Sequence, residues 1–421
     1  MNNLNPPSIN LSHVPNFIDL LHDKSCSTNN ILKLNKVVCK TNENKEYSII
    51  RYDKEVLSPD LVTSYGLCRS IIINDKNKVV SYSPPKSIPF DIFKQKYSPI
   101  TNEIVAEEFV EGTMINLFWD QTIGLSGSWE ISTRNNVGAN TSFFYSKPTK
   151  TFRDMFLEAV KANNLDLDKL NKVYNFSFVL QHPENRIVIP VKTLQLYLVS
   201  AYSIHHDSDD CIEIVNHKLS VIKEFKWMNT TIKFPKVYSF KEYSELIDKY
   251  SSLDTPYEIM GVVIKNENTF ERTKLRNPVY EEIKELRGNQ PKLQYQYICL
   301  RKEGKVKDYL KYYKEHKAPF NDFKKIIHNF TSSLLNNYIS CYVKKEKQLL
   351  EFPQQYRTHM FNMHQTYIKD LMEKKLYINK AFVINYINNL DPSLLMYSLN
   401  FNYRKRALDI IKNDKNDDKK L

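Results

Sequence analysis

Residues 107–120 read EEFVEGTMINLFWD and place an acidic residue and a glycine between two strand-like runs. The chain of 421 residues contains eight glycines, so a glycine at this point marks a specific requirement of the backbone. After the turn, two sets of mainly apolar side chains alternate from Met114 to Trp119, which predicts a strand covered at least partly on both faces. Glu111 is therefore expected at a turn that leads into a buried strand.

The same spacing is typical of a covalent nucleotidyltransferase motif, in which a lysine, a spacer, an Asp or Glu and a Gly precede a strand. The lysine of that motif attacks the α-phosphate of a nucleotide, but the corresponding position in this chain is Phe109. A phenyl ring cannot form a phosphoramide, because a nucleophile needs an amine, thiol, hydroxyl, carboxylate or imidazole. Lys94 and Lys96 precede the strand, and nothing in their spacing directs them to this position. The nucleophile is therefore either lost or supplied from elsewhere in the fold.

Short β-branched and aromatic runs separated by turn residues begin at Tyr47, and Asp75–Lys78 joins two of them as a hairpin. Further strands are predicted at 128–136, 176–181, 186–191, 194–202 and 256–266, and helices at 151–163, 238–250 and 277–288. From about residue 305 the apolar spacing is helical to the end. We therefore expect an α+β fold, with a domain of mainly antiparallel sheets and flanking helices followed by an all-α domain. The expected limits are a partly disordered segment at 1–45, the sheet domain at 46–299, the helical domain at 300–412 and a disordered tail at 413–421.

Positive charge is concentrated in the last third of the chain. The whole chain has 60 Lys and Arg against 48 Asp and Glu, and residues 300–421 hold 24 against 13. A basic module beside a near-neutral one suits a phosphate backbone, and an ordinary solvated surface is the alternative. Aromatic residues beside lysines, as in KDYLKYYKEHK at 307–317, would supply stacking surfaces for unpaired bases, with ordinary core as the alternative.

The sequence indicates no secretion, membrane or metal signal. Its six cysteines form no Cys-x-x-Cys pair, the N-terminus lacks a signal-peptide pattern, and no apolar run approaches transmembrane length. We expect a soluble, cytoplasmic protein with free thiols. The His and Asp residues at 205–210 could be imagined around a metal ion, but a solvated loop is preferred because their spacing fixes no coordination geometry.

The strands, taken in order, resemble the N-terminal nucleotidyltransferase domain of the bacteriophage T4 RNA ligase 1-like family. The resemblance covers roughly residues 45–280. It rests on four short stretches of sequence that follow one another in the same order as in the family. These are Leu67–Ile72 followed by the run Ser83–Phe90, the turn Glu111-Gly112, the stretch Pro183–Val188, and Gly261–Val263 followed by Lys274–Arg276.

This resemblance implies an activity and its site. Members of the family bind ATP, transfer AMP to the motif lysine and then to an RNA 5′-phosphate, and seal that end with a 3′-hydroxyl. The chemistry requires cations around phosphates and carboxylates for a metal ion, so ATP and Mg²⁺ are implied if the chain is active. The positions that match nucleotide- or phosphate-binding residues of the family are Arg69, Glu111, Gly112, Arg134, Arg186, Lys274 and Arg276.

Three family positions have changed to apolar residues, namely Phe109 for the lysine and Val179 and Met260 for two glutamates. Losing the nucleophile and two carboxylates together removes lysine adenylylation and weakens metal binding. Glu258, two residues before Met260 on the predicted strand, could stand in as a metal ligand beside Glu111.

The sequence thus predicts a degenerate RNA-ligase-family protein that lacks the lysine, binds RNA through its basic C-terminal domain, and retains a pocket for a nucleotide. The first alternative is an active ATP-dependent RNA repair ligase with an unrecognised nucleophile. The second is a non-catalytic interaction scaffold, in which Phe109, Val179 and Met260 fill the old pocket.

Overall fold

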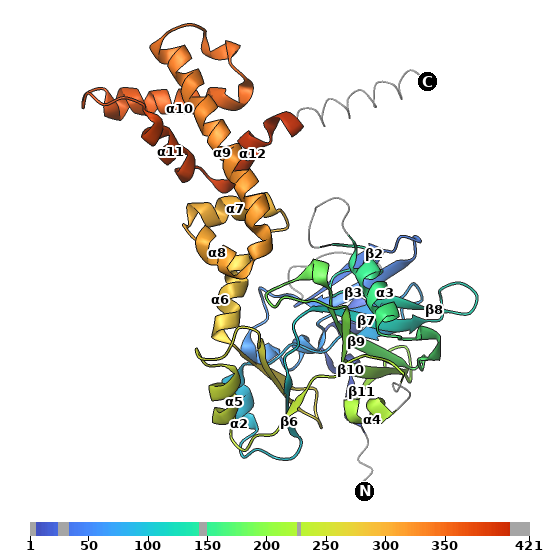
Figure 1. Ribbon diagram of the computed structural model, residues 1–421. Helices are drawn as coiled ribbons and strands as arrows, with labels where there is room; N and C mark the ends of the chain where they lie inside the picture. The colour runs from blue at the N-terminus through green and yellow to red at the C-terminus, as the bar shows by residue number, and fades with distance from the viewer. Residues whose placement is uncertain (1–5, 24–32, 143–149, 225–228, 405–421) are drawn as a thin grey trace, which may run out of the picture. The chain divides into compact units, whose positions relative to one another are not determined.

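The computed structural model describes residues 6–23, 33–142, 150–224 and 229–404 (Figure 1). The chain divides into two compact units, Met1–Lys284 and Glu285–Leu421. Antiparallel sheets with flanking helices make up the first unit and helices the second, which confirms the expected fold class. The expected domain limit at 299/300 stays a prediction, and the structural division falls at 284/285. The predicted tail at 413–421 lies outside the described residues.

Three antiparallel sheets form the described part of the first unit. The six-stranded sheet has the order β1-β11-β10-β9-β7-β8, with strands at Ser8–Asn10, Ile212–His217, Gln195–His206, Tyr174–Gln181, Thr113–Asp120 and Ser128–Ser132. The second sheet has the order β12-β6-β13-β14, with strands at Val237–Tyr238, Ile104–Glu108, Gly261–Asn266 and Arg272–Arg276. The third has the order β2-β3-β4-β5, with strands at Leu34–Lys40, Glu46–Tyr52, Ile71–Ile73 and Val79–Tyr82. The predicted hairpin is the β4–β5 pair.

The N-terminal segment contributes to these layers. β1 pairs with β11, with Ser8 opposite Val215, and β2 pairs with β3. Helix α1 (Phe17–His22) buries Phe17 and Leu21 completely. These apolar side chains join a core cluster with strands of the first and third sheets, so the described part of this segment belongs to the first unit.

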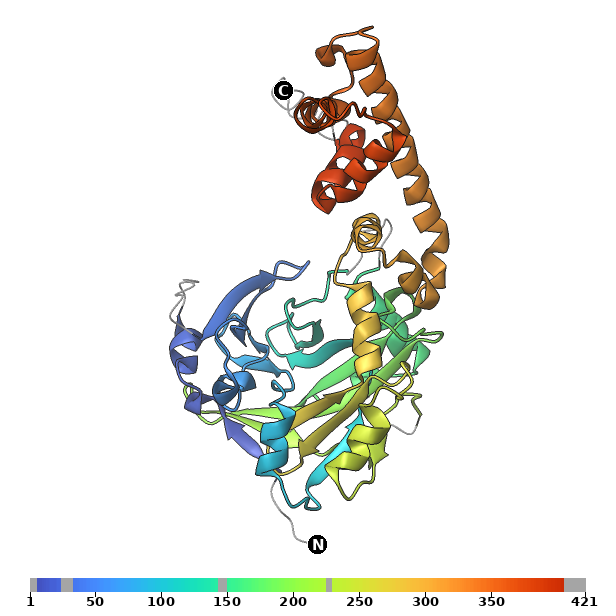
Figure 2. The ribbon, with the colours of Figure 1, turned by 90° about the vertical axis from the view of Figure 1, so that its left-hand side faces the viewer.

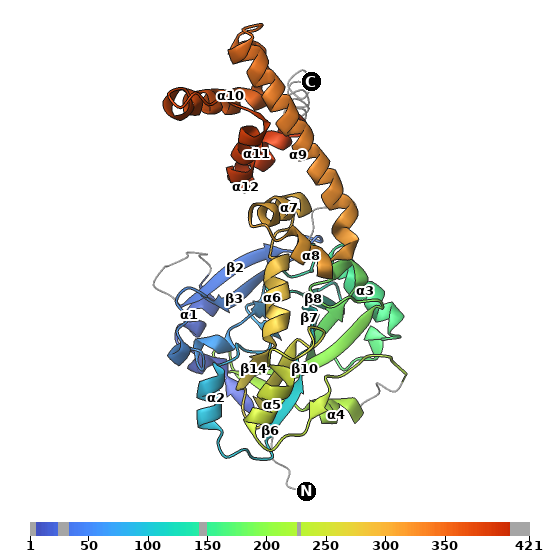
Figure 3. The same ribbon diagram turned by 60° about the vertical axis from the view of Figure 1, so that its left-hand side comes forward.

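The second sheet has one apolar and one polar face, because alternate residues of a strand point to opposite sides. The apolar face packs against helices α2 (Phe90–Lys96) and α5 (Tyr243–Tyr250), which lie beside β6 and β14 in Figure 3. It contains Ala106, Val262, Ile264 and Leu275. The intervening residues of β14 are Arg272, Lys274 and Arg276, which line a cavity on the opposite side.

The remaining helices of the first unit follow their sequence signals. Helix α3 (Phe152–Ala162) begins with a capping box, in which Thr151 accepts from the backbone of Asp154 and the Asp154 carboxylate accepts from the backbone of Thr151. Helix α4 covers Leu219–Glu224. Helix α6 (Pro278–Arg287) begins as predicted after Asn277, whose side chain accepts from the N–H of Val279.

Two predicted strands differ in the structure. Residues 186–191 form no strand, because Val188 and Ile189 donate their backbone N–H groups to the Glu111 carboxylate instead of to a neighbouring strand. The strand predicted at 256–266 begins only at Gly261, since residues 256–259 form a turn closed by the N–H of Ile259 on the carbonyl of Pro256. Glu258 therefore lies in an exposed turn and not on the strand that was predicted to carry it.

The second unit is helical throughout its described regular structure. Its helices are α7 Leu293–Lys302, α8 Val306–Tyr312, α9 Lys317–Tyr338, α10 Gln354–Thr366, α11 Lys380–Asn389 and α12 Pro392–Leu399. The long α9, orange in Figure 2, packs with α7, α10, α11 and α12. Within the part of the chain that the structure describes, no helix is long and apolar enough to cross a membrane.

Two of the tyrosines that the sequence offers as stacking surfaces are core residues. Tyr309 and Tyr313 are each 1% exposed, and their rings stack on one another with centroids 4.5 Å apart. Phe320 stacks on Tyr309 as well. The alternative interpretation is therefore correct for these two rings, because burial leaves them no face for a nucleic-acid base.

Candidate functional site

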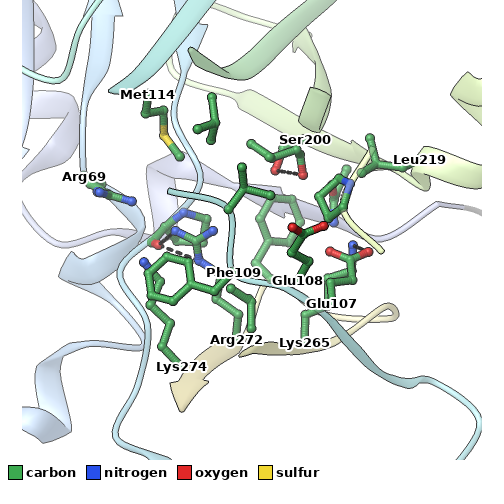
Figure 4. Close-up of a pocket in the computed structure, with 18 of the residues that line it drawn as sticks. Arg69, Glu107, Glu108, Phe109, Met114, Ser200, Leu219, Lys265, Arg272 and Lys274 are labelled. Carbon is green, nitrogen blue, oxygen red and sulfur yellow. Dashed lines mark hydrogen bonds and ion pairs between the residues drawn. The ribbon is translucent and has the colours of Figure 1, made fainter. Parts of the chain in front are cut away.

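A cavity of about 480 Å³ lies within the first unit, where the end of β6 and the beginning of β7 approach β13 and β14. It is lined by cations, two acidic residues of β6 and several apolar side chains (Figure 4). The three apolar replacements recognised in the sequence, Phe109, Val179 and Met260, all line this one cavity. They surround an open space, so they do not fill the pocket.

Two glycines allow the backbones to meet at this cavity. Gly112 has φ +150° and Gly261 has φ +130°, a region of backbone space that side chains rarely adopt. A methyl group on Gly112 would collide with the carbonyl oxygen of Leu180 on β9, and one on Gly261 with that of Leu275 on β14. Both glycines are therefore required for close packing of the strands around the pocket.

Phe109 lies directly against two cations of β14. The Lys274 amine is 4.3 Å from the centre of the Phe109 ring, and the Arg276 guanidinium carbon is 5.8 Å from it. Figure 4 shows the Lys274 side chain alongside this ring. The register explains the approach, because Glu107 and Lys274 both pair with Val263 of the strand between them. A cation over an aromatic face is attracted by the ring quadrupole.

Burial and like charges act together on the arginines and lysines of the pocket. Burial, followed by repulsion from the positive charge of Arg272, lowers the pKa of Arg69 to about 10. Burial also lowers the pKa of Arg272, whose guanidinium donates to the carbonyl oxygens of Pro84 and Pro85. Burial and then the charges of Arg272 and the other nearby cations lower the pKa of Lys274 to about 6. Each of these shifts means that burial and neighbouring positive charges disfavour the charged form of the side chain.

A second opening of about 410 Å³ adjoins the same cations. Its lining residues include six basic side chains and, among the described residues, no carboxylate. The basic side chains are Lys54, Arg69, Lys86, Arg134, Lys274 and Arg276. Burial followed by Arg69 and Arg134 lowers the pKa of Lys86, which shows that these charges repel one another. The guanidinium carbon of Arg134 lies 5.1 Å from the centre of the Tyr52 ring, so this cation packs over an aromatic face.

Glu111 lines neither of these two openings. Its side chain is 4% exposed, and both carboxylate oxygens accept hydrogen bonds from the N–H groups of Val188 and Ile189 at 3.0–3.2 Å. Burial raises the pKa of Glu111, although these backbone donors oppose the shift. The carboxylate therefore anchors the segment that follows β9, at the turn where the sequence analysis expected it.

The structure brings together most of the site residues expected from the sequence. Those that line the cavity or the basic opening are Arg69, Gly112, Arg134, Lys274 and Arg276. Arg186 and Glu258 are absent from both sets of lining residues. The side chain of Arg186 donates to the carbonyl oxygen of Val188, and Glu258 is exposed. The roles assigned to these residues stay predictions.

The carboxylates do not fit a metal site held by protein ligands alone. Among the described residues, no three His, Cys, Asp or Glu side chains gather closely enough to hold an ion. Glu107 is paired with Lys265 at 2.6 Å, and Glu271 with Lys96 at 2.7 Å. Both carboxylate oxygens of Glu111 accept backbone hydrogen bonds, and the metal role expected of Glu111 and Glu258 stays a prediction.

Sequence reasoning missed part of the cation cluster. Arg272 begins the pattern Arg-x-Lys-x-Arg on β14, and this alternation could have identified it. Lys86 lies directly after the recognised Ser83-Pro84-Pro85 run. Lys54 carries no comparable signal, because only the folding of the third sheet brings it to the opening.

These features define the class of protein as a two-unit α+β chain whose first unit contains a basic pocket beside antiparallel sheets. No protein-family model matches the chain. It is 25% identical over 268 residues to "Immediate-early protein ICP-46 homolog" of Invertebrate iridescent virus 6, a match over 59% of this chain and 55% of the relative. It is 24% identical over 203 residues to "RNA ligase" of Rhodothermus phage RM378, over 42% of this chain and 44% of the relative. The matches thus span about half the length of each curated relative, and the match to the phage protein supports an RNA ligase-like family.

The chain is also similar, at low sequence identity, to solved structures. Naegleria gruberi RNA ligase with PPi is 10% identical, with 59% of this chain and 97% of that chain covered and a TM-score of 0.31. A variant of the same ligase with ATP and Mn is 13% identical, with 42% and 51% covered and a TM-score of 0.31.

Proposed function

We propose that this chain is an RNA-ligase-type protein whose motif position 109 no longer accepts AMP and whose basic pocket binds the phosphates of a nucleotide or of an RNA end. The sequence likeness to a phage RNA ligase supports this class of ligand. A cytoplasmic location is part of the proposal, and the five described cysteines, which are free, are consistent with it.

The observation that carries the proposal is the opening lined by six basic side chains with no carboxylate among its described lining residues. Cations that share an opening without a carboxylate repel one another, even though Arg276 also pairs with Glu281 outside it, and folding holds them together at a cost in stability. A bound polyphosphate removes this cost, because it supplies the missing negative charge and accepts hydrogen bonds from the guanidinium groups. Burial first, and then the neighbouring cations, lower the pKa values of Arg69, Lys86 and Lys274, and a bound anion would oppose both effects.

The open cavity favours ligand binding over the scaffold alternative. Phe109, Val179 and Met260 line about 480 Å³ of space, which is within the range of small-molecule sites. An apolar wall beside a cluster of cations suits a ligand with a planar base at one end and phosphates at the other.

The test compares three single-stranded RNAs of one sequence that differ in the 5′ end, with a hydroxyl, a monophosphate or a triphosphate, by fluorescence anisotropy. We expect affinity to increase with the number of 5′ phosphates and ATP to compete. Arg69→Ala should weaken binding of the phosphorylated ends about tenfold, which corresponds to roughly 1.4 kcal/mol. Lys94→Ala, on the exposed side of α2, serves as the matched control. Equal affinity for all three ends would refute a phosphate pocket.

The helical unit is proposed as the second RNA-binding surface, on the basis of its surplus of Lys and Arg. Lys344, Lys345 and Lys347 are exposed after α9. Their joint replacement by Ala should weaken RNA binding without changing the preference for a 5′ phosphate. It should also flatten the plot of log affinity against log salt by about 0.7 for each RNA phosphate that the protein no longer neutralises. An unchanged salt slope would remove this unit from the RNA interface.

A further inference from the structure

We propose that Lys274 forms a covalent bond to AMP, supplying the amine that position 109 lacks. The inference rests on the proposed function, since it requires the pocket to hold a nucleoside triphosphate. It goes further by giving the pocket a chemical step and by naming the atom that performs it.

Lys274 reaches the motif position across one intervening strand. It lies on β14, opposite Val263 of β13, and β13 in turn pairs with β6, which ends next to Phe109. The backbone N–H of Phe109 donates to the carbonyl of Gly261 at 3.3 Å. Lys274, Val263 and Glu107 are register partners across the three strands, and Phe109 follows Glu107 by two residues, so the Lys274 side chain projects on the side of the sheet where Phe109 lies. Its amine consequently lies 4.3 Å from the centre of the Phe109 ring.

The amine is held without a counter-charge. Among the described residues it has no hydrogen bond and no ion pair, and its recorded contact is the face of the Phe109 ring. The charged groups around it are Arg69, Lys86, Arg272 and Arg276. Glu107 of β6 pairs with Lys265, and Glu281 of α6 pairs with Arg276.

This environment produces the form of lysine that reacts. Burial and the neighbouring cations lower the pKa of Lys274 to about 6, so that the amine is largely uncharged at neutral pH. An uncharged amine has a free electron pair and is a nucleophile, whereas an ammonium group is not. A bound triphosphate raises this pKa again, so the reaction of the complex should accelerate as the pH increases above neutrality.

The step itself balances with ATP as the only co-reactant. The Lys274 nitrogen attacks the α-phosphorus, a P–N bond forms, and the bond from the α-phosphorus to the bridging oxygen breaks. Pyrophosphate leaves with that electron pair, and the nitrogen releases one proton to solvent. Arg69 and Arg276 remain positioned to bind the departing phosphates, since both line the basic opening with Lys274.

The experiment incubates the full chain with α-³²P-ATP and Mg²⁺, separates it on a denaturing gel, and maps the modified peptide by mass spectrometry. We expect an acid-labile adduct of AMP on Lys274, and its loss in Lys274→Arg, which keeps a cation but removes the nucleophile. Lys94→Arg is the matched control and should label as the unchanged chain does. Absence of label, or label on another residue, would overturn the inference.

A parallel measurement separates this inference from the proposed function. Binding of α,β-methylene-ATP, whose bridge cannot be cleaved, is measured by equilibrium dialysis for the same three proteins. If the analogue binds but ATP leaves no adduct, the covalent step is wrong and the phosphate pocket stands. If neither occurs, both are wrong. Lys274→Arg should still bind the analogue, which also shows that the variant is folded.

Discussion

The carboxylate of Glu111 accepts hydrogen bonds from the backbone N–H groups of Val188 and Ile189 at 3.0–3.2 Å, although 77 and 78 residues separate them in the chain. This interaction replaces the strand expected at 186–191 and fixes the segment after β9 against the turn before β7. Glu111 therefore has a structural role that is independent of any ligand.

Glu111→Ala should lower the free energy of unfolding by about 3 kcal/mol, because two backbone donors lose their acceptor and Val188 is completely buried. Urea unfolding followed by tryptophan fluorescence measures this change. Glu258→Ala is the control, since the exposed side chain should leave stability within about 0.5 kcal/mol. Equal effects of the two substitutions would contradict the structural role of Glu111.

Gly112→Ala should be clearly more destabilising than Gly124→Ala. Both glycines have positive φ, which costs a residue with a side chain about 1–2 kcal/mol. A methyl group at Gly124 meets nothing within 4 Å, whereas at Gly112 it would collide with the carbonyl oxygen of Leu180. The urea midpoint of Gly112→Ala should be the lower of the two, because the collision adds to the backbone strain, and coincident midpoints would show that the pocket wall is less tightly packed than described.

The stability of the protein should depend on pH through Lys274. Its pKa is about 6 in the folded chain against an ordinary value of 10.5, so between these limits the unfolded chain binds a proton that the folded chain does not. Stability should accordingly increase with pH across this window. Lys274→Met should flatten the plot of unfolding free energy against pH from 6.5 to 9, and Lys94→Met, with an exposed lysine, should not. Parallel plots for the unchanged chain and Lys274→Met would show that the amine is well hydrated.

Moving the amine back to the motif position provides a separate test of the pocket. The double variant Phe109→Lys with Lys274→Met keeps one amine in the cavity but attaches it to the residue after β6. We expect AMP to be attached at position 109 after incubation with α-³²P-ATP. Phe109→Met with Lys274→Met, which has no amine at either place, should remain unlabelled. If the Phe109→Lys, Lys274→Met variant remains unlabelled, we would conclude that the cavity does not orient ATP as a nucleotidyltransferase pocket does.

The sequence by itself determined the fold class. It also determined that the side chain at position 109 cannot act as a nucleophile. Alternation along 113–120 and the Asn277-Pro278 start of α6 are local signals, so they identify a strand and a helix without knowledge of neighbours. The residue type at position 109 is likewise sufficient to exclude a nucleophile there, because a phenyl ring is not a nucleophile in any conformation.

Only the tertiary structure decided which groups share the pocket. Position 109 and Lys274 are far apart in sequence, and their approach depends on the register of three strands. Sequence patterns predicted a strand at 186–191, whereas long-range hydrogen bonds join Val188 and Ile189 of this segment to Glu111. The pKa of Lys274 also has a tertiary cause, since burial and cations from several elements determine it together. Charge and burial act through space, and sequence spacing does not measure distance in the folded chain.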